Sequence, residues 1–280
     1  MQESPSIRLI GLFQGVRLTP TQRRIAQCLV EHAGTAAYLS SGELAELAQV
    51  SQPSVTRFAM AVGYDGYPAL RRAMRELVTN GPAETADDAR RNELQRAVAA
   101  EIDNLRHLGE LLADPRPITE AGKVLTASRP LPVVGLRSAA HAAGYFGYFA
   151  AKIHPDVRVL DSGGSLLADR LDQARAAGAT AMLAFVLPRY PREALDALAE
   201  ARRQGLKTVV ITDSAVSPVA EHADLTLPAA VGSQLVFDLH TAPMVLAMVL
   251  LQAMCDAAPG DTAERLERFE QSAARRQIFT

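Results

Sequence analysis

The sequence predicts an all-α helix-turn-helix domain at the N-terminus, followed by an α/β domain with a five-stranded parallel sheet covered by helices on both faces. Three observations support this prediction. Residues 39–68 contain two short helices joined by a tight turn, and residues 80–92 are polar and mark a boundary. From Leu131 onward, short apolar strands alternate with helical segments.

The first of the two short helices begins with a capping box. Ser40 is placed to accept a hydrogen bond from the backbone of Glu43, whose side chain reaches back to the backbone of Ser40. We expect the helix that starts in this way to turn Leu44 and Leu47 toward a core.

The second short helix follows the connection 49–50, with Ser51 as its candidate cap and Pro53 in its first turn, where proline is tolerated. Its apolar residues recur with helical spacing and predict one buried face: Val55, Phe58, Ala59 and Val62. The opposite face is polar. This layout is typical of a helix-turn-helix, whose second helix enters the DNA major groove.

The polar face supplies candidate contacts to DNA. Gln52 suits adenine, and Arg57 suits guanine or a phosphate. Ser54 and Thr56 suit either kind of group. The next predicted helix, 68–78, carries three arginines that either contact phosphates or form a solvated face. The candidate DNA-binding residues are Ser51, Gln52, Ser54, Thr56, Arg57 and Arg71.

A helix before this pair completes the expected trihelical domain. Thr19 and Gln22 form a second capping box around Pro20. The helix ends near Gly34, and one side of it carries Ile25, Cys28, Leu29 and His32. Cys28 and the second cysteine, Cys255, have no metal-ligand spacing, so we interpret both as structural thiols without a disulfide.

Composition limits the class of protein. A chain of 280 residues that is 48% apolar can bury a large core and is long enough for two domains. Residues 1–80 hold eight arginines and six acidic residues, a net charge of +2, whereas the whole chain carries −2. A uniformly basic nucleic-acid binder is therefore excluded. The pattern of a signal peptide and uncharged apolar stretches of 18 residues are both missing, so we expect a cytoplasmic protein without membrane contact.

We predict a DNA-binding domain over 1–80, a linker and long helix over 81–115, a ligand-binding domain over 116–260 and a helical tail over 261–280. The tail offers Leu266 and Phe269 as docking points. The long helix carries an apolar stripe made of Leu94, Val98, Ile102, Leu105, Leu108 and Leu112. Either the second domain or a partner chain covers this stripe.

The ligand-binding domain contains five candidate strands that are apolar throughout, which is typical of a parallel sheet buried on both faces. They are Leu131–Leu136, Val157–Leu160, Ala181–Leu187, Thr208–Thr212 and Leu225–Leu227. The intervening helices are predicted over Ala139–Ile153, Leu166–Ala177, Arg192–Gln204 and Val236–Asp256, with a short helical turn near Ser217–Glu221.

Ligands of such sheets bind beyond the carboxyl ends of the strands, where helix N-termini present N–H groups. In this chain the strand ends are followed by four polar segments. These segments are 137–138, 161–164, 188–190 and 213–214.

At these residues the sequence resembles the RpiR-type family of bacterial transcription regulators. The family joins a helix-turn-helix to a sugar isomerase (SIS) domain that senses a sugar phosphate or a related metabolite. The resemblance extends over nearly the whole chain. Its most specific parts are VSQPSVTRFAMAVGYDGYPALR (Val50–Arg71), GLRSA (Gly135–Ala139) and VVITDSAVSPVAEHADLTL (Val209–Leu227). It implies a five-stranded SIS sheet, a homodimer or homotetramer, and affinity for operator DNA that a ligand changes.

The resemblance also implies ligand contacts. Ser138 matches the serine after the first SIS strand, which bonds the ligand's phosphate in many members. The family's second phosphate loop is rich in serine and threonine, but here the loop 185–193 carries two arginines and a tyrosine instead. Arginine forks suit phosphate or carboxylate, so we expect a small anionic effector, either a phosphosugar or a carboxylate. Alternatively, these arginines pair with Glu193 or face water. The candidate ligand-binding residues are Arg137, Ser138, His141, Ser162, Arg189, Tyr190, Arg192 and His240.

SIS isomerases need a general base within reach of the sugar. The histidines and glutamates of the second domain form no motif with a nucleophile and have no metal-ligand spacing. We therefore expect that the protein is not an enzyme and that it has no catalytic residue, metal or cofactor. Two alternatives remain open. One is a sugar-phosphate isomerase whose N-terminal helices serve assembly, and the other is a metabolite-binding scaffold that does not bind DNA.

Overall fold

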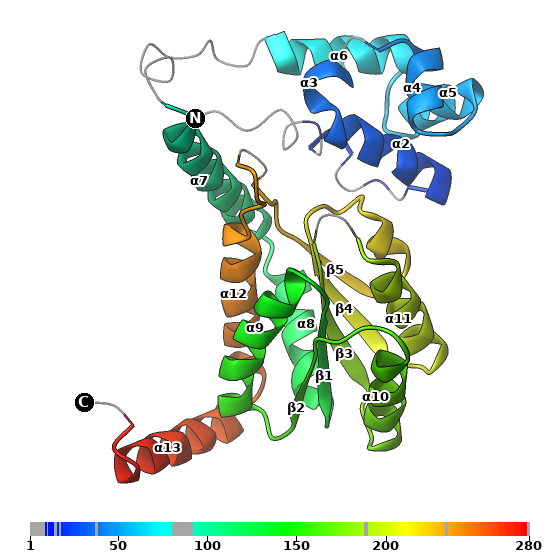
Figure 1. Cartoon of the computed structure of the whole chain (residues 1–280). Helices are drawn as coiled ribbons and strands as arrows, with labels where there is room; N and C mark the ends of the chain where they lie inside the picture. Colours follow the sequence, from blue (N-terminus) through cyan, green and yellow to red (C-terminus); the bar gives the residue numbers. More distant parts are fainter. Residues whose placement is uncertain are drawn as a thin grey trace. The chain divides into compact units, whose positions relative to one another are not determined.

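The computed structural model of the chain (Figure 1) describes residues 9, 11–13, 16, 18–36, 39–79, 92–187, 190–232 and 235–278. The chain divides into two compact units. The N-terminal unit comprises Met1–Glu110, Ser214–Glu221 and Ala230–Thr241. The sheet unit comprises Leu111–Asp213, His222–Ala229 and Ala242–Thr280.

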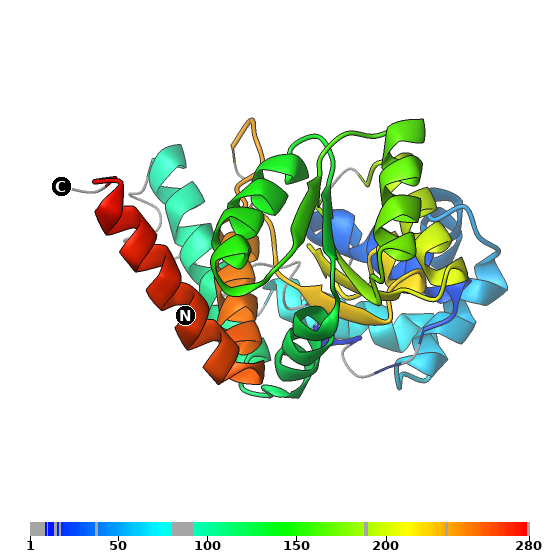
Figure 2. The same ribbon diagram turned by 90° about the horizontal axis from the view of Figure 1, so that it is seen from below.

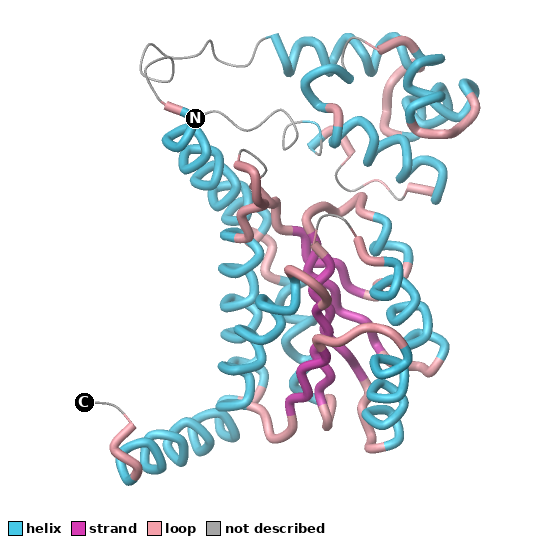
Figure 3. Tube along the Cα trace, in the orientation of Figure 1, coloured by secondary structure: helices cyan, strands magenta, loops and turns pink. Residues whose placement is uncertain are grey.

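The N-terminal unit is helical (Figure 3). Its helices are α2 (Pro20–Glu31), α3 (Ala33–Ala36), α4 (Ser41–Leu47), α5 (Gln52–Ala61), α6 (Tyr67–Thr79) and α7 (Glu93–Leu111, which ends at the first residue of the sheet unit). Both predicted capping boxes are present, with Thr19 before α2 and Ser40 before α4. The core contains large side chains with no exposed surface, including Ile25, Leu29, Leu44, Phe58, Leu70 and Met74.

The helix-turn-helix has the predicted buried face on α5, because Val55, Phe58, Ala59 and Val62 are all buried. One inward prediction is wrong. Leu44 is buried, but Leu47 is 46% exposed because the inward side of this segment is formed by Leu44, Ala45 and Ala48, and Leu47 does not lie on that side. The chain then leaves α4 through Gln49, whose φ of 53° reverses its direction before α5.

The predicted parallel sheet is confirmed. Its strands are β1 (Leu131–Gly135), β2 (Val157–Leu160), β3 (Ala181–Val186), β4 (Lys207–Thr212) and β5 (Leu225–Pro228). They pair in the order β2-β1-β3-β4-β5, and all neighbours are parallel. Every residue of β1 and β3 is buried, as expected for strands covered on both faces.

Helices cover both faces of the sheet, as Figure 2 shows. α9 (Ala139–Ile153) lies against β1 and β2, and α8 (Arg116–Ala127) lies against β3, β4 and β5. α10 (Ser165–Ala176) and α11 (Arg192–Arg203) pack together on the other side. α8 was not predicted from the sequence. α12 (Thr241–Ala257) begins five residues later than predicted, because residues 236–240 form a loop with a bridge between Gly232 and Leu239.

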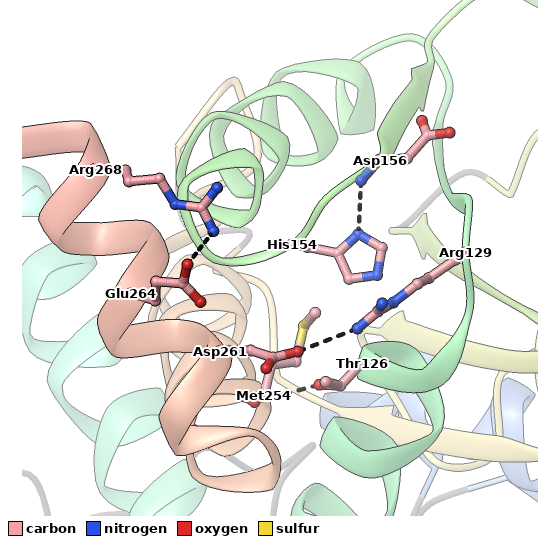
Figure 4. Close-up of polar contacts among 8 residues, drawn as sticks. All are labelled: Thr126, Arg129, His154, Asp156, Met254, Asp261, Glu264 and Arg268. Carbon is pink, nitrogen blue, oxygen red and sulfur yellow. Dashed lines mark hydrogen bonds and ion pairs between the residues drawn. The ribbon is translucent and has the colours of Figure 1, made fainter. Parts of the chain in front are cut away.

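The C-terminal helix α13 (Pro259–Arg275) packs against α9. Phe269 docks as predicted, since the ammonium of Lys152 on α9 lies 4.3 Å from the centre of its ring. Leu266 does not dock and is 38% exposed. At the start of α13, Asp261 forms an ion pair with Arg129 at 3.3 Å (Figure 4). These contacts hold α13 against α9 and against Arg129, which lies just before β1.

The long helix α7 does not bury its predicted stripe. Leu94, Val98 and Ile102 are 67%, 61% and 44% exposed, whereas Leu108 is buried. The inward side of α7 consists instead of Ala97, Glu101, Asn104 and Leu108. Glu101 accepts a hydrogen bond from Asn104 at 2.8 Å and lies against Gly232, where a β-carbon would collide with its carboxylate.

Among the described residues, no single helix is long and apolar enough to cross a membrane. By length and composition alone, α12 and α13 pass that test as a pair, with a bend of 111° between them.

Candidate functional site

The carboxyl ends of the parallel strands meet at one edge of the sheet (Figure 1), and we call the residues that follow them the strand-end site. β1 and β3 are neighbours there, with Gly135 paired to Phe185. The chain leaves β1 through α9 toward β2 and leaves β3 through α11 toward β4, in opposite directions along the sheet. Parallel sheets bind ligands at such a switch point, so the loops after β1 and β3 form its centre.

The loop after β1 carries three predicted ligand residues. Arg137 has a φ of 55°, a left-handed conformation that costs a non-glycine residue free energy and often occurs at functional sites. Ser138 is the N-cap residue of α9, but its side chain does not cap the helix. His141 follows in the first turn of α9. All three side chains are exposed, so a ligand at the strand ends can reach them.

The loop after β2 contains Ser162, whose hydroxyl donates to the carboxylate of Asp161 at 3.2 Å. The neighbouring Gly163 lies against the carboxylate of Glu193 from the start of α11, and a β-carbon there would collide with it. A negative charge of the protein itself therefore lies beside Ser162, in the first turn of α11.

Tyr190 and Asp213 form the main polar contact of the strand-end site. The phenol of Tyr190 donates to both carboxylate oxygens of Asp213, at 2.8 and 2.9 Å. The hydroxyl of Thr212, which is buried at the end of β4, donates to the same carboxylate at 3.0 Å. These bonds join the loop after β3 to the end of β4. Asp213 was predicted to lie at a strand end but not to be a site residue, because only the sheet order brings Tyr190 next to it.

The remaining predicted ligand residues are less closely grouped. Arg192 is the first residue of α11 and is exposed. Arg189 lies outside the described residues. His240 belongs to the N-terminal unit, directly before α12, so its part in the site stays a prediction.

The second candidate surface is the polar face of α5. Gln52, Thr56 and Arg57 are exposed there, opposite the buried face. Ser51 precedes α5 as its N-cap residue, but its side chain makes no capping bond and instead shares a hydrogen bond of 2.9 Å with the hydroxyl of Ser54. Arg57 donates to that same Ser54 hydroxyl at 3.2 Å. A hydroxyl, amide and guanidinium surface on the first two turns of a helix is suited to reading base edges.

Two of these side chains also have contacts within the helical domain. Gln52 donates to the hydroxyl of Ser41 at 2.9 Å, which links the starts of α5 and α4. Arg71 is half-buried, and its guanidinium donates to the carbonyl of Leu39 at 3.5 Å, beside a stronger bond from Tyr67 at 3.0 Å. Arg71 therefore helps to hold the start of α4, whatever else it contacts.

The described residues contain no group of three or more histidine, cysteine or acidic side chains that could hold a metal ion. Among the histidines of the sheet unit, His154 is buried at the end of α9, and its Nδ1 accepts a hydrogen bond from the backbone of Asp156 at 3.3 Å. It is the C-cap residue of α9, at the opposite end of that helix from Ser138, and Figure 4 shows its neighbours Asp156 and Arg129.

Comparison with known proteins gives matches to both domains. A family model described as the helix-turn-helix domain of the rpiR family matches residues 13–81. A model of the SIS domain matches residues 125–253. The two matched segments contain the α5 surface and the strand-end site respectively.

Two relatives are named as regulators. The chain is 40% identical over 76 residues to the uncharacterized HTH-type transcriptional regulator YfhH of Escherichia coli, which covers 27% of this chain and 26% of that protein. It is 29% identical over 131 residues to the HTH-type transcriptional regulator HexR of Pseudomonas aeruginosa, covering 45% and 46%. The matches thus span less than half of the length of these two relatives.

Two solved structures share the fold. The sugar isomerase domain of an RpiR transcription factor from Sphaerobacter thermophilus is 26% identical to this chain, with a TM-score of 0.57. The match covers 63% of this chain and 97% of the other chain. The NanR protein of Vibrio vulnificus, complexed with ManNAc-6P, is 17% identical, with a TM-score of 0.56 over 97% and 98% of the two chains.

Proposed function

Because this chain belongs to the RpiR family, with a helix-turn-helix domain followed by a SIS domain, we propose that it is a DNA-binding transcription regulator. A small anionic metabolite, bound at the strand-end site, controls its affinity for operator DNA. The observation that carries the proposal is the geometry of α5. One side of this helix is completely buried, while Gln52, Thr56 and Arg57 stand exposed on the other. The apolar side packs into the core of the domain, and the polar side is suited to lie in the major groove of DNA.

The strand-end site supports an effector with two kinds of groups. Arg137, Ser138 and Arg192 offer positive charge and a hydroxyl for an anionic end. Asp213 and Glu193 are carboxylates of the same site, and carboxylates accept hydrogen bonds. Asp213 accepts from Tyr190, and Glu193 lies against Gly163. An effector that combines an anionic end with hydroxyl or ammonium groups satisfies both. The ManNAc-6P complex of NanR supports a phosphosugar as the effector. The absence of the hydroxyl-rich loop from this sequence supports a metabolite that carries a carboxylate together with several hydroxyl groups.

Pairing of two chains is part of the proposal, because a small net charge of +2 in residues 1–80 gives little non-specific affinity and two half-sites compensate for this. The stripe of α7 supports such pairing. Leu94, Val98 and Ile102 lie at successive turns and remain exposed in the single chain. A second copy of the chain presents the same stripe, so two of them are self-complementary about a twofold axis.

Retention of DNA in a native gel tests the function. The purified full-length protein is expected to retain the DNA upstream of its own gene and to leave unrelated DNA of equal length free at moderate salt. In parallel, the protein is incubated with aldose phosphates and the ketose products are measured. Retention without conversion supports the regulator, whereas conversion without retention means that the protein is an isomerase whose N-terminal helices serve assembly. Binding of metabolites with neither activity identifies a scaffold.

A further inference from the structure

One segment of the chain joins the strand-end site to the helix-turn-helix domain. Ser214–Glu221 directly follows Asp213 yet belongs to the N-terminal unit. Val216 is 6% exposed and lies in the same buried cluster as the core residues of α2, α4 and α5. Ser214 and Ser217 on either side of it are buried as well. A loop that only connected β4 to β5 would have no reason to place an apolar side chain in that core.

A second contact lies at the other end of the segment. Its last four residues form the 3-10 helix η2 (Pro218–Glu221), which packs against α2. The carboxylate of Glu221 lies 3.5 Å from Nε of Arg23 on α2. The side chain of Glu221 is 34% exposed and that of Arg23 is 24% exposed. A partly exposed pair contributes little free energy, but its position shows that the segment lies beside Arg23 of α2.

At its beginning, the segment follows directly on Asp213 of the strand-end site. Asp213 takes hydrogen bonds from Tyr190 at 2.8 and 2.9 Å and from Thr212 at 3.0 Å. Only Ser214 and Ala215 separate this carboxylate from the buried side chain of Val216. The N–H of Ser217 donates to the carbonyl of Ser214 at 3.2 Å, so these residues form a turn and the path from the backbone at Asp213 to Val216 is short.

We propose that Asp213 is the residue through which the strand-end site controls the helix-turn-helix domain, with Ser214–Glu221 as the connecting element. The inference rests on the proposed function, since it assigns a route for the regulation proposed above. An effector whose hydroxyl or ammonium group donates to Asp213 replaces the bonds from Tyr190. The effector therefore binds more tightly to the state in which the bonds between Tyr190 and Asp213 are broken than to the state in which they are formed. Such a difference in affinity between two states is the requirement for coupling between two sites.

Hydrogen exchange of the full-length protein, without DNA or effector, tests this route. Tyr190→Phe removes the phenol that holds Asp213 and keeps the aromatic ring. We expect exchange to become faster, on the order of fivefold as for the loss of one hydrogen bond, in peptides that cover Ser214–Glu221 and α2. Asp213→Asn keeps the size of the side chain and is expected to act in the same direction.

Tyr148→Phe is the matched control, because Tyr148 is an exposed tyrosine of α9 in the same unit. It is expected to leave the exchange of α2 unchanged. Faster exchange confined to residues 181–213 in both Tyr190→Phe and Asp213→Asn would overturn the proposal, as would an equal effect of Tyr148→Phe on α2. Because exchange is measured without DNA, this failure is distinct from a failure to retain DNA, which would contradict the proposed function instead.

Discussion

Ser40 and Glu43 cap the first helix of the helix-turn-helix reciprocally. The N–H of Ser40 donates to the Glu43 carboxylate at 2.7 Å, and the N–H of Glu43 donates to the Ser40 hydroxyl at 3.2 Å. The bond from the backbone of Ser40 is the main reason why the pKa of Glu43 lies below its usual value. Both bonds satisfy N–H groups that would otherwise have no partner in the helix.

Loss of this cap is expected to destabilise the DNA-reading domain. Ser40→Ala removes the acceptor for the N–H of Glu43 and is expected to cost about 1 kcal/mol of helix stability. Hydrogen exchange of α4 and α5 in the full chain measures the effect as faster local opening. Ser272→Ala, in the last turn of α13, is the control and is expected to change little. Equal exchange of α4 in wild type and Ser40→Ala would show that the cap contributes nothing.

Arg57 is expected to contribute directly to DNA affinity. Arg57→Ala removes a guanidinium from the exposed face of α5 and is expected to weaken operator binding by about 1–3 kcal/mol if it reads a guanine, with relaxed specificity at one position. If it contacts a phosphate, binding weakens on all sequences and the salt dependence falls by about one ion. Titration by fluorescence anisotropy at several salt concentrations separates these results. Arg106→Ala, on an exposed arginine of α7, is the control. Unchanged affinity at every salt concentration would remove Arg57 from the contact surface.

The stripe of α7 is expected to hold two chains together. Val98 is 61% exposed at the middle of this stripe. Val98→Glu places a charge where two stripes would meet, and burying an unpaired charge is costly, so the assembly is expected to dissociate. Sedimentation velocity measures the mass. Leu166→Glu, on an exposed leucine of α10, is the control for an added charge. An unchanged mass of the Val98→Glu protein would show that a different surface forms the oligomer.

Arg137 combines a strained backbone with a predicted role in ligand binding. Its φ of 55° suits glycine. Arg137→Gly is expected to raise stability by about 1 kcal/mol, whereas Arg137→Ala keeps the strain. Both are expected to lose binding of whichever anion shifts the melting temperature of the wild type in a screen of phosphorylated sugars and carboxylates. Loss of the guanidinium without loss of the shift would exclude Arg137 as a ligand residue.

His154 is expected to make the stability of the sheet unit depend on pH. Burial lowers its pKa from the usual value of 6.5. The backbone of Ser128 raises the pKa in part, and the positive charges of Arg129 and Arg265 lower it further. Asp156 bonds its Nδ1, and Asp261 is paired with Arg129 (Figure 4). Its Nε2 is buried and makes no hydrogen bond within the part of the chain that the structure describes.

Because the unfolded state binds a proton near pH 6.5 while the folded state still excludes it, stability is expected to fall as the pH drops below about 6.5. The loss ends below the lowered pKa of the folded state. His154→Asn keeps an acceptor for the backbone of Asp156 and does not titrate, so its stability is expected to vary less between pH 7.5 and 5.5, roughly the range where histidine changes charge. Urea unfolding at each pH measures this difference. Parallel curves for the two proteins would contradict it.

Much of the fold was predictable because its signals are local. The capping boxes at Thr19 and Ser40 depend on residues three apart, and the strands depend on short apolar runs. β2 and α9 have the predicted bounds, and the other strands differ from prediction by one residue at an end. α8 was missed because two of the four residues on its buried side, Ala121 and Gly122, are too small to give a clear hydrophobic period in the sequence.

The candidate site was predictable only in part. Its place followed from the general rule for parallel sheets, and Arg137, Ser138 and Tyr190 do lie at strand ends. The contact between Tyr190 and Asp213 joins residues 23 apart in the chain, and no local pattern relates them. On α7, periodicity alone could not tell which side faces inward, because an apolar stripe meets its partner only in a folded protein or an assembly.

By itself, the sequence determined which elements form, since hydrogen-bonding caps and hydrophobic periods act within a few residues of each other. It also determined that α5 has one apolar and one polar side. The tertiary structure decided which distant groups meet: Tyr190 with Asp213, Glu193 with Gly163, and Val216 with the core of the helix-turn-helix. Such contacts depend on sheet order and on where loops return, and these follow from the packing of the whole chain.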